Sequence, residues 1–476
     1  MTGRPSWATT GCHSASDAVK PMNQPGLYSR GVTAVPAAPR RKILYVAYYF
    51  PPFAGSGAWS PLAAVNALAK RGHDVTVLAA DQWTYGLAGQ AFDPALAPMI
   101  DPSVKVYRWP FPLGSHDPVI TRWDKERVAA FSGPPTKRTR WEQTTKRNWS
   151  QVFPEPSAAA AFGRGYAPLT AAARHLHRIN LFDLVITTAS PWMDFAVPLQ
   201  LGAETGVPTV IYDRDAWLFD VFTGEPSLNA ALIEPLLAQL LSQATRAWFV
   251  SEPIAEAHRQ RFPEHAAKIV AVLNGWDPEF LPADIAPPVR EQGKGLVFRF
   301  VGARQARFPL ETLLDGWKRA RQIDEVVARS ELQFVGPNQA AVTGPGFAKL
   351  GITCRDNLPR VDLADVYRQT DALVFLKEGV GMGPSGKIFE YAATGLPIVA
   401  ALHPDHSARQ ILSGRDLVFY AQGVEPDAIA KALVAAARHQ PTAGQVAQAH
   451  QHAEQYRRDR SLEVAFEDLE EALGWK

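Results

Sequence analysis

The chain of 476 residues is 46% hydrophobic and 20% charged, which is ordinary globular material and enough for two or three domains with their own cores. Its 49 Lys and Arg residues nearly balance its 47 Asp and Glu residues, so overall charge gives no reason to expect a nucleic-acid-binding protein. Its two cysteines, Cys12 and Cys354, exclude a disulfide framework, and a reducing cytoplasm is the expected location.

The first part of the chain differs in composition from the rest. Residues 1–40 are rich in Ser, Thr, Pro, Ala and Gly without a periodic apolar pattern, so we predict a disordered lead-in, with Met22 as a second candidate start. The segment lacks the apolar centre of a secretory signal, and no stretch of the chain approaches the roughly 20 apolar residues of a spanning helix. We expect a soluble protein.

Regular patterns begin at Lys42 and predict a first α/β domain over residues 41–282. Helical segments separate several apolar runs, and the first of these helices should end at Gly72, where a residue free to take positive φ is favoured. Buried parallel strands have this unbroken apolar character, so the runs predict a doubly wound sheet. The predicted strands are residues 42–50, 74–80, 183–189, 208–213, 247–251 and 268–273.

One segment of the first domain is less regular. Residues 137–149, KRTRWEQTTKRNW, interleave basic side chains with two tryptophans. A solvated insertion is the expected role, and peripheral contact with a membrane surface or with a phosphate-rich partner is the alternative.

A second α/β domain is predicted after a proline- and glycine-rich interdomain linker at residues 283–295. The alternation of apolar runs and helices restarts there and continues over residues 296–445. Residues 446–476 end in a helix with Leu462, Phe466 and Leu469 on one face, which could pack back on the first domain. The predicted strands are residues 296–302, 332–336, 372–376, 397–401 and 417–420.

The stretch GMGPSGKIFEYAATGLP, residues 381–397, has the features of a phosphate-binding loop. Its glycines and Lys387 fit the spacing of a triphosphate loop, but Ile388 stands where that loop has the Ser or Thr that holds Mg²⁺. Ser385 is a favoured N-cap, and the free N–H groups of the next helix, with Lys387 as an exposed cation, would bind an anion. Because triphosphate loops usually follow the first strand of their domain, a different kind of phosphate cradle is the favoured interpretation.

Glu390 lies one turn after Lys387 on the same side of the predicted helix. It could form an i, i+3 ion pair with Lys387 that contributes about 0.2–0.5 kcal/mol. Alternatively, the two residues could form a nucleotide clamp, in which Lys387 contacts phosphate and Glu390 accepts hydrogen bonds from ribose hydroxyls.

The segment SGKIFEYAATGLPIVAA closely resembles the donor-binding segment of the family 4 glycosyltransferases, which are retaining enzymes of the two-domain GT-B fold. Other segments resemble this family in the expected order along residues 42–440. YYFPPFAGSGAWS resembles its first loop, ITTASPWMDF and VIYDRDAWLF its middle segment, and VSEPIAEAHRQRFPEHAAKIVAVLNGWDPEF the stretch that enters the second domain. The resemblance implies two doubly wound Rossmann-like domains that face each other across a cleft.

The resemblance also implies which residues bind a nucleotide-diphosphate donor. The second domain would hold it through Ser385, Gly386, Lys387 and Glu390, with Glu390 on the ribose. The first domain would contribute its first loop, which would face the phosphates and sugar of the donor. The alternative is that this loop is only a structural turn. That loop contains Gly55, Ser56 and Gly57.

Several positions depart from the family pattern. Close relatives often carry an Arg a few positions after the first loop, where Trp59, Ser60 and Pro61 stand in this chain. Arg214 stands where many members have a His that helps to hold the donor sugar. Arg304 and Arg307 lie near the places of the Arg and Lys that usually face the diphosphate, and either could be only a loop cation. Glu378, a further candidate for donor binding, precedes Glu390 by twelve residues instead of the usual eight.

Two groups of polar residues could suggest a metal. Asp213 and Asp215 in the DRD motif are spaced like the metal ligands of another glycosyltransferase fold, and His403 and His406 lie close together in sequence. The carboxylates, however, end a predicted strand in a segment that binds no metal in family 4, and histidines of a polar loop are usually solvated. We predict no metal site and no cofactor, with the nucleotide-sugar as a co-substrate.

The sequence therefore predicts a retaining, metal-independent hexosyltransferase that moves a sugar from a nucleotide-diphosphate donor to a hydroxyl acceptor. Arg214, Asp215 and Lys387 are the predicted catalytic residues. The expected partners are the nucleotide-sugar and a sugar, lipid-linked or small-molecule acceptor, with no nucleic acid. A GT-B-fold sugar-nucleotide epimerase or hydrolase and a non-catalytic sugar-nucleotide-binding relative are the alternatives.

Overall fold

The structure is a computed structural model that describes most of the chain after the first 38 residues. The predicted lead-in up to residue 38 and the basic insertion at residues 137–149 lie outside the described residues. Among the described helices, none combines the length and the apolar character that a membrane span requires. The described residues are 39–80, 93–109, 162, 166–189, 191–227, 229–304, 308–337, 339–355 and 358–475.

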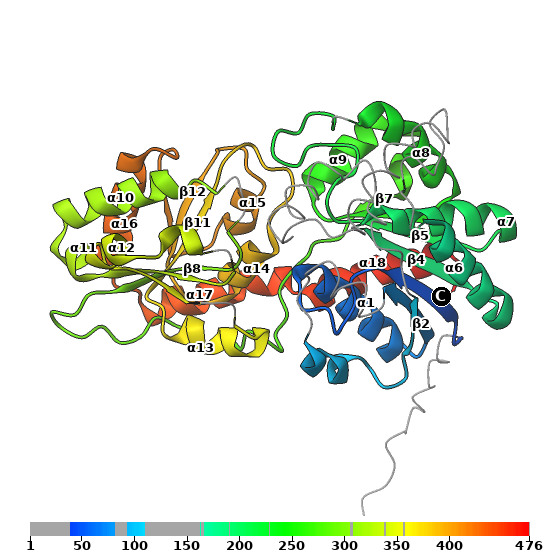
Figure 1. Cartoon of the computed structure of the whole chain (residues 1–476), viewed down its shortest axis with the longest axis horizontal. Coiled ribbons are helices and arrows are strands. Elements are labelled where there is room, and N and C mark those ends of the chain that lie inside the picture. The colour runs from blue at the N-terminus through cyan, green and yellow to red at the C-terminus, as the bar shows by residue number, and fades with distance from the viewer. Residues whose placement is uncertain are drawn as a thin grey trace, which may run out of the picture. The chain divides into compact units, whose positions relative to one another are not determined.

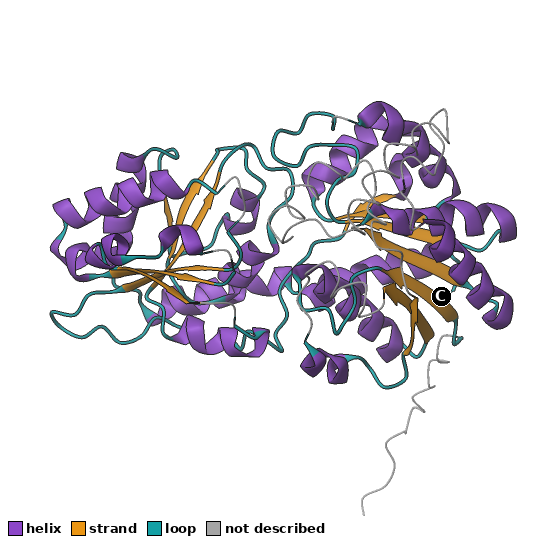
Figure 2. Cartoon of the chain, in the orientation of Figure 1, coloured by secondary structure: helices purple, strands orange, loops and turns teal. Residues whose placement is uncertain are grey.

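The described strands form two sheets in which all neighbouring strands run parallel (Figures 1 and 2). The first sheet has seven strands in the order β3-β2-β1-β4-β5-β6-β7, and the second has six in the order β10-β9-β8-β11-β12-β13. The predicted pair of doubly wound sheets is thereby confirmed. The strand order of each sheet reverses beside its first strand, between β1 and β4 and between β8 and β11, where ligands bind in folds of this kind.

The strands of the first sheet are β1 (Lys42–Ala47), β2 (Asp74–Ala80), β3 (Lys105–Trp109), β4 (Leu184–Ala189), β5 (Thr209–Asp213), β6 (Arg246–Phe249) and β7 (Ile269–Ala271). Those of the second are β8 (Val297–Val301), β9 (Glu331–Val335), β10 (Ile352–Arg355), β11 (Ala372–Lys377), β12 (Ile398–Leu402) and β13 (Val418–Tyr420).

Two of these strands, β3 and β10, were not predicted from the sequence. Each lies at an edge of its sheet. Burial alternates along β10, where Ile352 is buried and Thr353 is exposed, and Tyr107 of β3 is also exposed. These two strands are covered incompletely, so their sequences do not form the unbroken apolar run that marks a central parallel strand.

Helices cover both faces of the first sheet. Successive side chains of β1 alternate, so that Tyr45 packs in one apolar cluster with α1 and α18, while Leu44 packs in another with α6 and α8. Gly72, just beyond α1, has φ +88°, which confirms the predicted helix end. The helices are α1 (Trp59–Lys70), α6 (Tyr166–Asn180), α7 (Ala203–Thr205), α8 (Ala230–Gln243), α9 (Glu252–Arg261) and α18 (Arg458–Ala472).

The second sheet is covered in the same way. Val374 and Leu376 of β11 pack with α10 and α16, while Leu373 and Phe375 pack with α13 and α14, and α17 lies beside α14 (Figure 1). The helices are α10 (Leu310–Ile323), α11 (Glu325–Arg329), α12 (Pro345–Lys349), α13 (Leu363–Arg368), α14 (Gly386–Ala393), α15 (Ala408–Leu412), α16 (Pro426–Arg438) and α17 (Ala443–Ala453).

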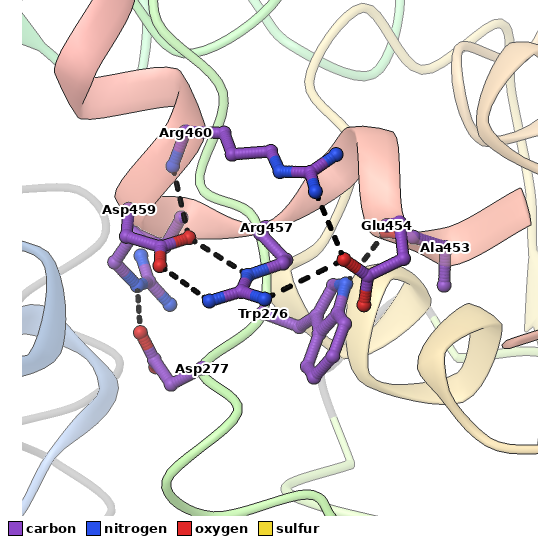
Figure 3. A network of polar contacts seen from close by, with 8 residues as sticks. Trp276, Asp277, Ala453, Glu454, Arg457, Asp459 and Arg460 are labelled. Atoms are coloured by element: carbon purple, nitrogen blue, oxygen red, sulfur yellow. Dashed lines mark hydrogen bonds and ion pairs between the residues drawn. The ribbon is translucent and has the colours of Figure 1, made fainter. Parts of the chain in front are cut away.

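The segment after β7 and the segment between α17 and α18 are bound to each other. The Trp276 N–H donates to the Tyr456 carbonyl at 3.1 Å, and the Trp276 carbonyl accepts from the Arg458 N–H at 2.9 Å. The Trp276 indole N–H donates to the Ala453 carbonyl at 2.8 Å (Figure 3). Gly275 has φ +61°, and a Cβ there would lie 2.7 Å from the Arg458 backbone, so only glycine allows this approach. These bonds fix where α18 begins.

We expect Phe466→Ala to lower the free energy of unfolding by about 3–5 kcal/mol, the usual cost of deleting a buried aromatic side chain. Phe466 is 1% exposed on α18 and meets the Trp248 ring edge-on at 5.6 Å. Val464 on the same helix is 66% exposed, so Val464→Ala is the matched control and should change the free energy by less than about 0.5 kcal/mol. Urea unfolding followed by tryptophan fluorescence measures both, and equal losses would contradict the packing of α18.

Candidate functional site

The carboxyl ends of β8 and β11 and the start of α14 lie at the reversal point of the second sheet. Ser385 precedes α14 with an extended backbone (φ −60°, ψ 139°), so its position as the N-cap is confirmed. Its hydroxyl makes no capping bond to the helix; instead its carbonyl accepts from the Ile388 N–H at 3.0 Å. The first N–H groups of a helix have no partner within the helix, and they point toward its N-terminal side, where an anion is stabilised.

Lys387 is half-buried, so the expectation of an exposed cation is wrong. Its ammonium lies 4.1 Å from the centroid of the Phe300 ring on β8. Gly302, at φ +123°, has its Cβ position only 2.7 Å from the Lys387 Nζ, so a larger residue would displace the lysine. Burial, and next the charge of Lys377, lower the pKa of Lys387 to about 7, against the opposing charge of Glu390.

Lys377, at the end of β11, is a second cation that the sequence analysis missed. It shares the strand face of Leu373 and Phe375, which is the face that α14 covers. Burial lowers the pKa of Lys377 to about 8. The signal in the sequence was a lone charge at the end of an apolar run, ALVFLK, where a parallel strand delivers its last side chain to the ligand-binding edge.

His406 is also buried, with 4% of its surface exposed, so the expectation of a solvated histidine is wrong for this residue. Its Nδ1 accepts from the Ala408 N–H at 3.0 Å, and its ring lies against Gly381, whose φ is +58°. Burial, and next the charge of Lys377, lower the pKa of His406 to about 4, so the imidazole is neutral at physiological pH. His403, in contrast, is exposed.

Glu390 pairs with Arg360 and not with Lys387, so the simple i, i+3 ion pair is wrong. Its Oε1 lies 2.8 Å from the Arg360 Nη1. The Arg360 Nη2 in turn lies 3.3 Å from Asp277 Oδ2. Helix α14 is held to β8 beside this pair, where the Val301 N–H donates to the Tyr391 hydroxyl at 2.7 Å.

The loop between Glu378 and Ser385 explains the long spacing between the two glutamates. The Gly381 N–H donates to the Phe222 carbonyl at 3.3 Å, and the Met382 N–H donates to the Val221 carbonyl at 2.8 Å. The Met382 carbonyl accepts from the Ser251 hydroxyl at 2.7 Å. The extra residues thus bind segments that follow β5 and β6, while Glu378 itself is exposed.

The first loop and Arg214 meet at the carboxyl ends of β1, β4 and β5. Arg214 is half-buried; its Nη2 donates to the Gly57 carbonyl and its Nε to the Ala189 carbonyl, both at 3.0 Å. Ser56 opens a short 3₁₀ turn that leads into α1, with Gly55 in an extended conformation before it. A Cβ on Gly57 would lie 2.9 Å from the Tyr49 ring, so this glycine is needed for packing.

The two carboxylates of the DRD motif differ in environment. Asp213 is fully buried and accepts from the Trp217 N–H at 2.9 Å and from the Trp192 indole N–H at 3.1 Å. Burial raises the pKa of Asp213 to about 6. Asp215 is exposed, and its N–H donates to Asp213. Asp213 therefore orders the turn after β5, and in the part of the chain that the structure describes no three His, Cys, Asp or Glu side chains cluster as metal ligands do.

Asp194 is a buried carboxyl that the sequence analysis missed. Its Oδ2 accepts from the Tyr48 N–H at 2.8 Å, which fixes the chain just after β1. Burial raises the pKa of Asp194 to about 8, so the group is protonated at neutral pH. Of the two arginines expected near the diphosphate, Arg304 is half-buried in the loop after β8, and Arg307 lies outside the described residues.

Two family models match the sequence. Glycosyltransferase Family 4 matches residues 125–280, and a model described as Glycosyl transferase-like matches residues 289–463. No curated protein matches.

Solved glycosyltransferases share the fold over almost their whole length. α,α-Trehalose 6-phosphate synthase of Burkholderia multivorans is 14% identical, with a TM-score of 0.58 over 91% of this chain and 99% of that one. HepE of Anabaena, solved with UDP and glucose, is 15% identical, with a TM-score of 0.55 over 91% of this chain and 100% of that one. Sucrose-phosphate synthase of Thermosynechococcus elongatus is 14% identical, with a TM-score of 0.56 over 91% and 99%. The predicted GT-B fold is confirmed.

We expect Lys387→Met to raise the free energy of unfolding at pH 6.5 and to raise it less at pH 9. Between about pH 7 and the ordinary lysine pKa, the unfolded chain binds a proton that the folded wild type has released, so wild-type stability rises with pH in this interval. Urea unfolding at the two pH values measures the effect. Lys431→Met, at an exposed position of α16, is the control and should not alter the pH dependence. A variant less stable than the wild type at pH 6.5 would contradict the buried cation.

Proposed function

We propose that this chain, which matches Glycosyltransferase Family 4 over residues 125–280, transfers a hexosyl group from a nucleoside-diphosphate donor to a hydroxyl acceptor with retention of configuration. The observation that carries the proposal is the half-buried Lys387 at the start of α14, beside Gly302 and the end of β8. In this proposal, residues 296–445 bind the donor and residues 41–282 bind the acceptor, in a cytoplasmic protein.

The buried cation favours a strongly anionic ligand. Lys387 and Lys377 repel each other, and desolvation disfavours the charged form of both. A diphosphate at the N-terminus of α14 would reverse both effects, because its charge is complementary to the lysines and to the helix dipole. Arg304 and Arg307, in the loop after β8, are proposed to contribute to the same site.

Glu390 is the proposed ribose contact. A carboxylate accepts hydrogen bonds from two adjacent hydroxyls, and the position three residues after Lys387 places it one helical turn from the proposed phosphate site. Ser385 and Gly386 would expose the helix start to the phosphates, and Glu378 is the proposed contact on the sugar side.

The chemistry requires that negative charge be stabilised on the departing diphosphate while the sugar gains oxocarbenium character. Groups that are already oriented toward that charge lower the barrier because they need no reorganisation during the reaction. Lys387 and the N–H groups of α14 supply positive charge here, so the proposed reaction needs no metal ion. The acceptor hydroxyl would attack from the side of the leaving group, and the departing phosphate would take its proton.

The first loop is proposed to face the donor through Gly55, Ser56 and Gly57. Arg214 fixes the Gly57 carbonyl, so we assign it a positioning role on this loop. Asp215 is exposed at the end of β5, and it is the proposed side-chain contact to the reacting sugar or the acceptor.

Thermal unfolding against UDP, GDP, ADP and TDP, in EDTA and in Mg²⁺, tests the donor class. A diphosphate at one hundred times its dissociation constant should stabilise the protein by about 2.7 kcal/mol, seen as a raised midpoint. We expect a rise with one diphosphate in EDTA, and its loss in Lys387→Met. UDP-glucose, present in a crystal structure of HepE, is the first sugar conjugate to add.

Three other outcomes would contradict parts of the proposal. A rise only in Mg²⁺ contradicts metal independence, and no rise with any diphosphate or sugar conjugate contradicts the donor class. Consumption of a nucleotide-sugar without product on any added acceptor would favour the epimerase or hydrolase.

We expect Glu390→Ala to weaken the binding of the stabilising nucleoside diphosphate and of its nucleoside by about 10- to 100-fold, since hydrogen bonds to a charged group contribute about 1.5–3 kcal/mol. Inorganic pyrophosphate should bind Glu390→Ala as tightly as it binds the wild type, because it lacks ribose. Isothermal titration calorimetry well below the unfolding midpoint measures all three ligands. Glu311→Ala, at an exposed position of α10, is the control. An unchanged nucleoside affinity in Glu390→Ala would contradict the assignment of Glu390 as the ribose contact.

A further inference from the structure

Arg360 lies at the centre of a chain of four charged side chains from distant parts of the sequence. It joins Glu390 of α14 on one side, at 2.8 Å, and Asp277 on the other, at 3.3 Å. Asp277 also accepts from the Arg458 Nε at 2.7 Å. Arg360 and Glu390 are 14% and 16% exposed, so water competes weakly for this pair.

Two aromatic rings hold the Arg360 guanidinium in place. It lies 4.6 Å from the centroid of Trp59 and 4.8 Å from that of Phe280, and the two rings meet edge-on at 5.2 Å. A planar guanidinium against aromatic faces has little rotational freedom.

The Asp277 end of this row of four charged side chains is anchored to the protein backbone. Asp277 follows Trp276, whose indole bonds the end of α17 and whose main chain bonds Tyr456 and Arg458, the first residue of α18. Figure 3 shows this anchor, with Arg457 beside it bonded to Asp459 and Glu454. Arg360 is therefore held at its aromatic faces and at its Asp277 end, which leaves Glu390 as the group that it orients.

A half-buried ion pair is a poor source of net stability, because desolvation offsets most of its Coulomb attraction. Such a pair can instead fix the direction of a side chain. The Glu390 side chain has three rotatable bonds. Fixing these bonds when the ligand binds would cost conformational entropy and lower the affinity, so a carboxylate that accepts from two ribose hydroxyls binds better if it is already oriented.

We propose that Arg360 is a positioning residue for the donor, fixing the Glu390 carboxylate in the direction that receives the ribose hydroxyls. This inference rests on the proposed function, since it takes Glu390 as the ribose contact. It predicts an effect on nucleoside recognition alone, because the proposed phosphate contacts come from Lys387 and the start of α14.

The test compares Arg360→Met, Arg360→Lys and the control Arg368→Ala, which removes an arginine that pairs at the surface with Asp284 and Asp365. UDP, uridine and inorganic pyrophosphate are titrated by calorimetry, with the GDP, ADP and TDP series in parallel. Arg360→Met should bind the nucleoside and its diphosphate about tenfold more weakly and pyrophosphate unchanged, since a misaligned carboxylate costs part of a charged hydrogen bond. Arg360→Lys should recover part of the loss, and Arg368→Ala should match the wild type.

A kinetic comparison and a double variant separate positioning from structural damage. In Arg360→Met the KM for the nucleotide-sugar should rise while kcat changes by less than about twofold. Adding Arg360→Met to Glu390→Ala should weaken nucleoside binding no further, because both changes remove the same contact. Asp277→Asn keeps Arg360 and its pair with Glu390, so it should cause a smaller loss of nucleoside affinity. This variant takes the place of Arg360→Met in the test if Arg360→Met does not fold.

Unchanged or tighter nucleoside binding in Arg360→Met would overturn the proposal, as would an equal loss for pyrophosphate or additive losses in the double variant. If the wild type binds none of the diphosphates, the proposed function fails and this inference fails with it. If the wild type binds one and Arg360→Met binds it equally well, only this inference fails.

Discussion

Parallel pairing throughout both sheets is the constraint on which the rest of the structure depends. Because every strand ends at the same edge of its sheet, the residues that follow β8 and β11 are delivered to one place, and so are those that follow β1, β4 and β5. Residues as far apart in sequence as Phe300 and Lys387, or Gly57 and Arg214, thereby come into contact. The apolar faces of the strands hold this edge in position through the helices on either side.

Burial at these edges disfavours the charged forms of several side chains. Desolvation lowers the pKa values of Lys377 and Lys387 and raises those of Asp194 and Asp213. The two acids offset part of the cost with main-chain or indole N–H donors, and they fix the turns after β1 and β5. The two lysines repel each other, and this repulsion is why we place an anionic ligand beside them.

Arg360 links the proposed donor contact to the start of α18. Its partners come from the segment after β7, from α14 and, through Asp277, from α18, so the orientation of Glu390 depends on segments that are far apart in the sequence. The loop after β11 makes similar bonds to residues that follow β5 and β6. A family with a common fold can vary such supporting residues while the helix start that faces the phosphates stays the same.

The sequence by itself determined the central strands, the start of α14 at Ser385 and the positive φ at Gly72, because burial, capping and turn chemistry leave local patterns. Its segments also carried the resemblance to glycosyltransferases that two family models match. It did not predict the edge strands β3 and β10, whose partial exposure removes the apolar run. Only the tertiary structure decided that Lys387 is half-buried near Lys377, that His406 is buried, and that Glu390 pairs with Arg360 rather than with its helical neighbour. The reason is physical: the environment of a charged side chain is set by segments that the fold brings to it, and no spacing within its own segment records which segments those are.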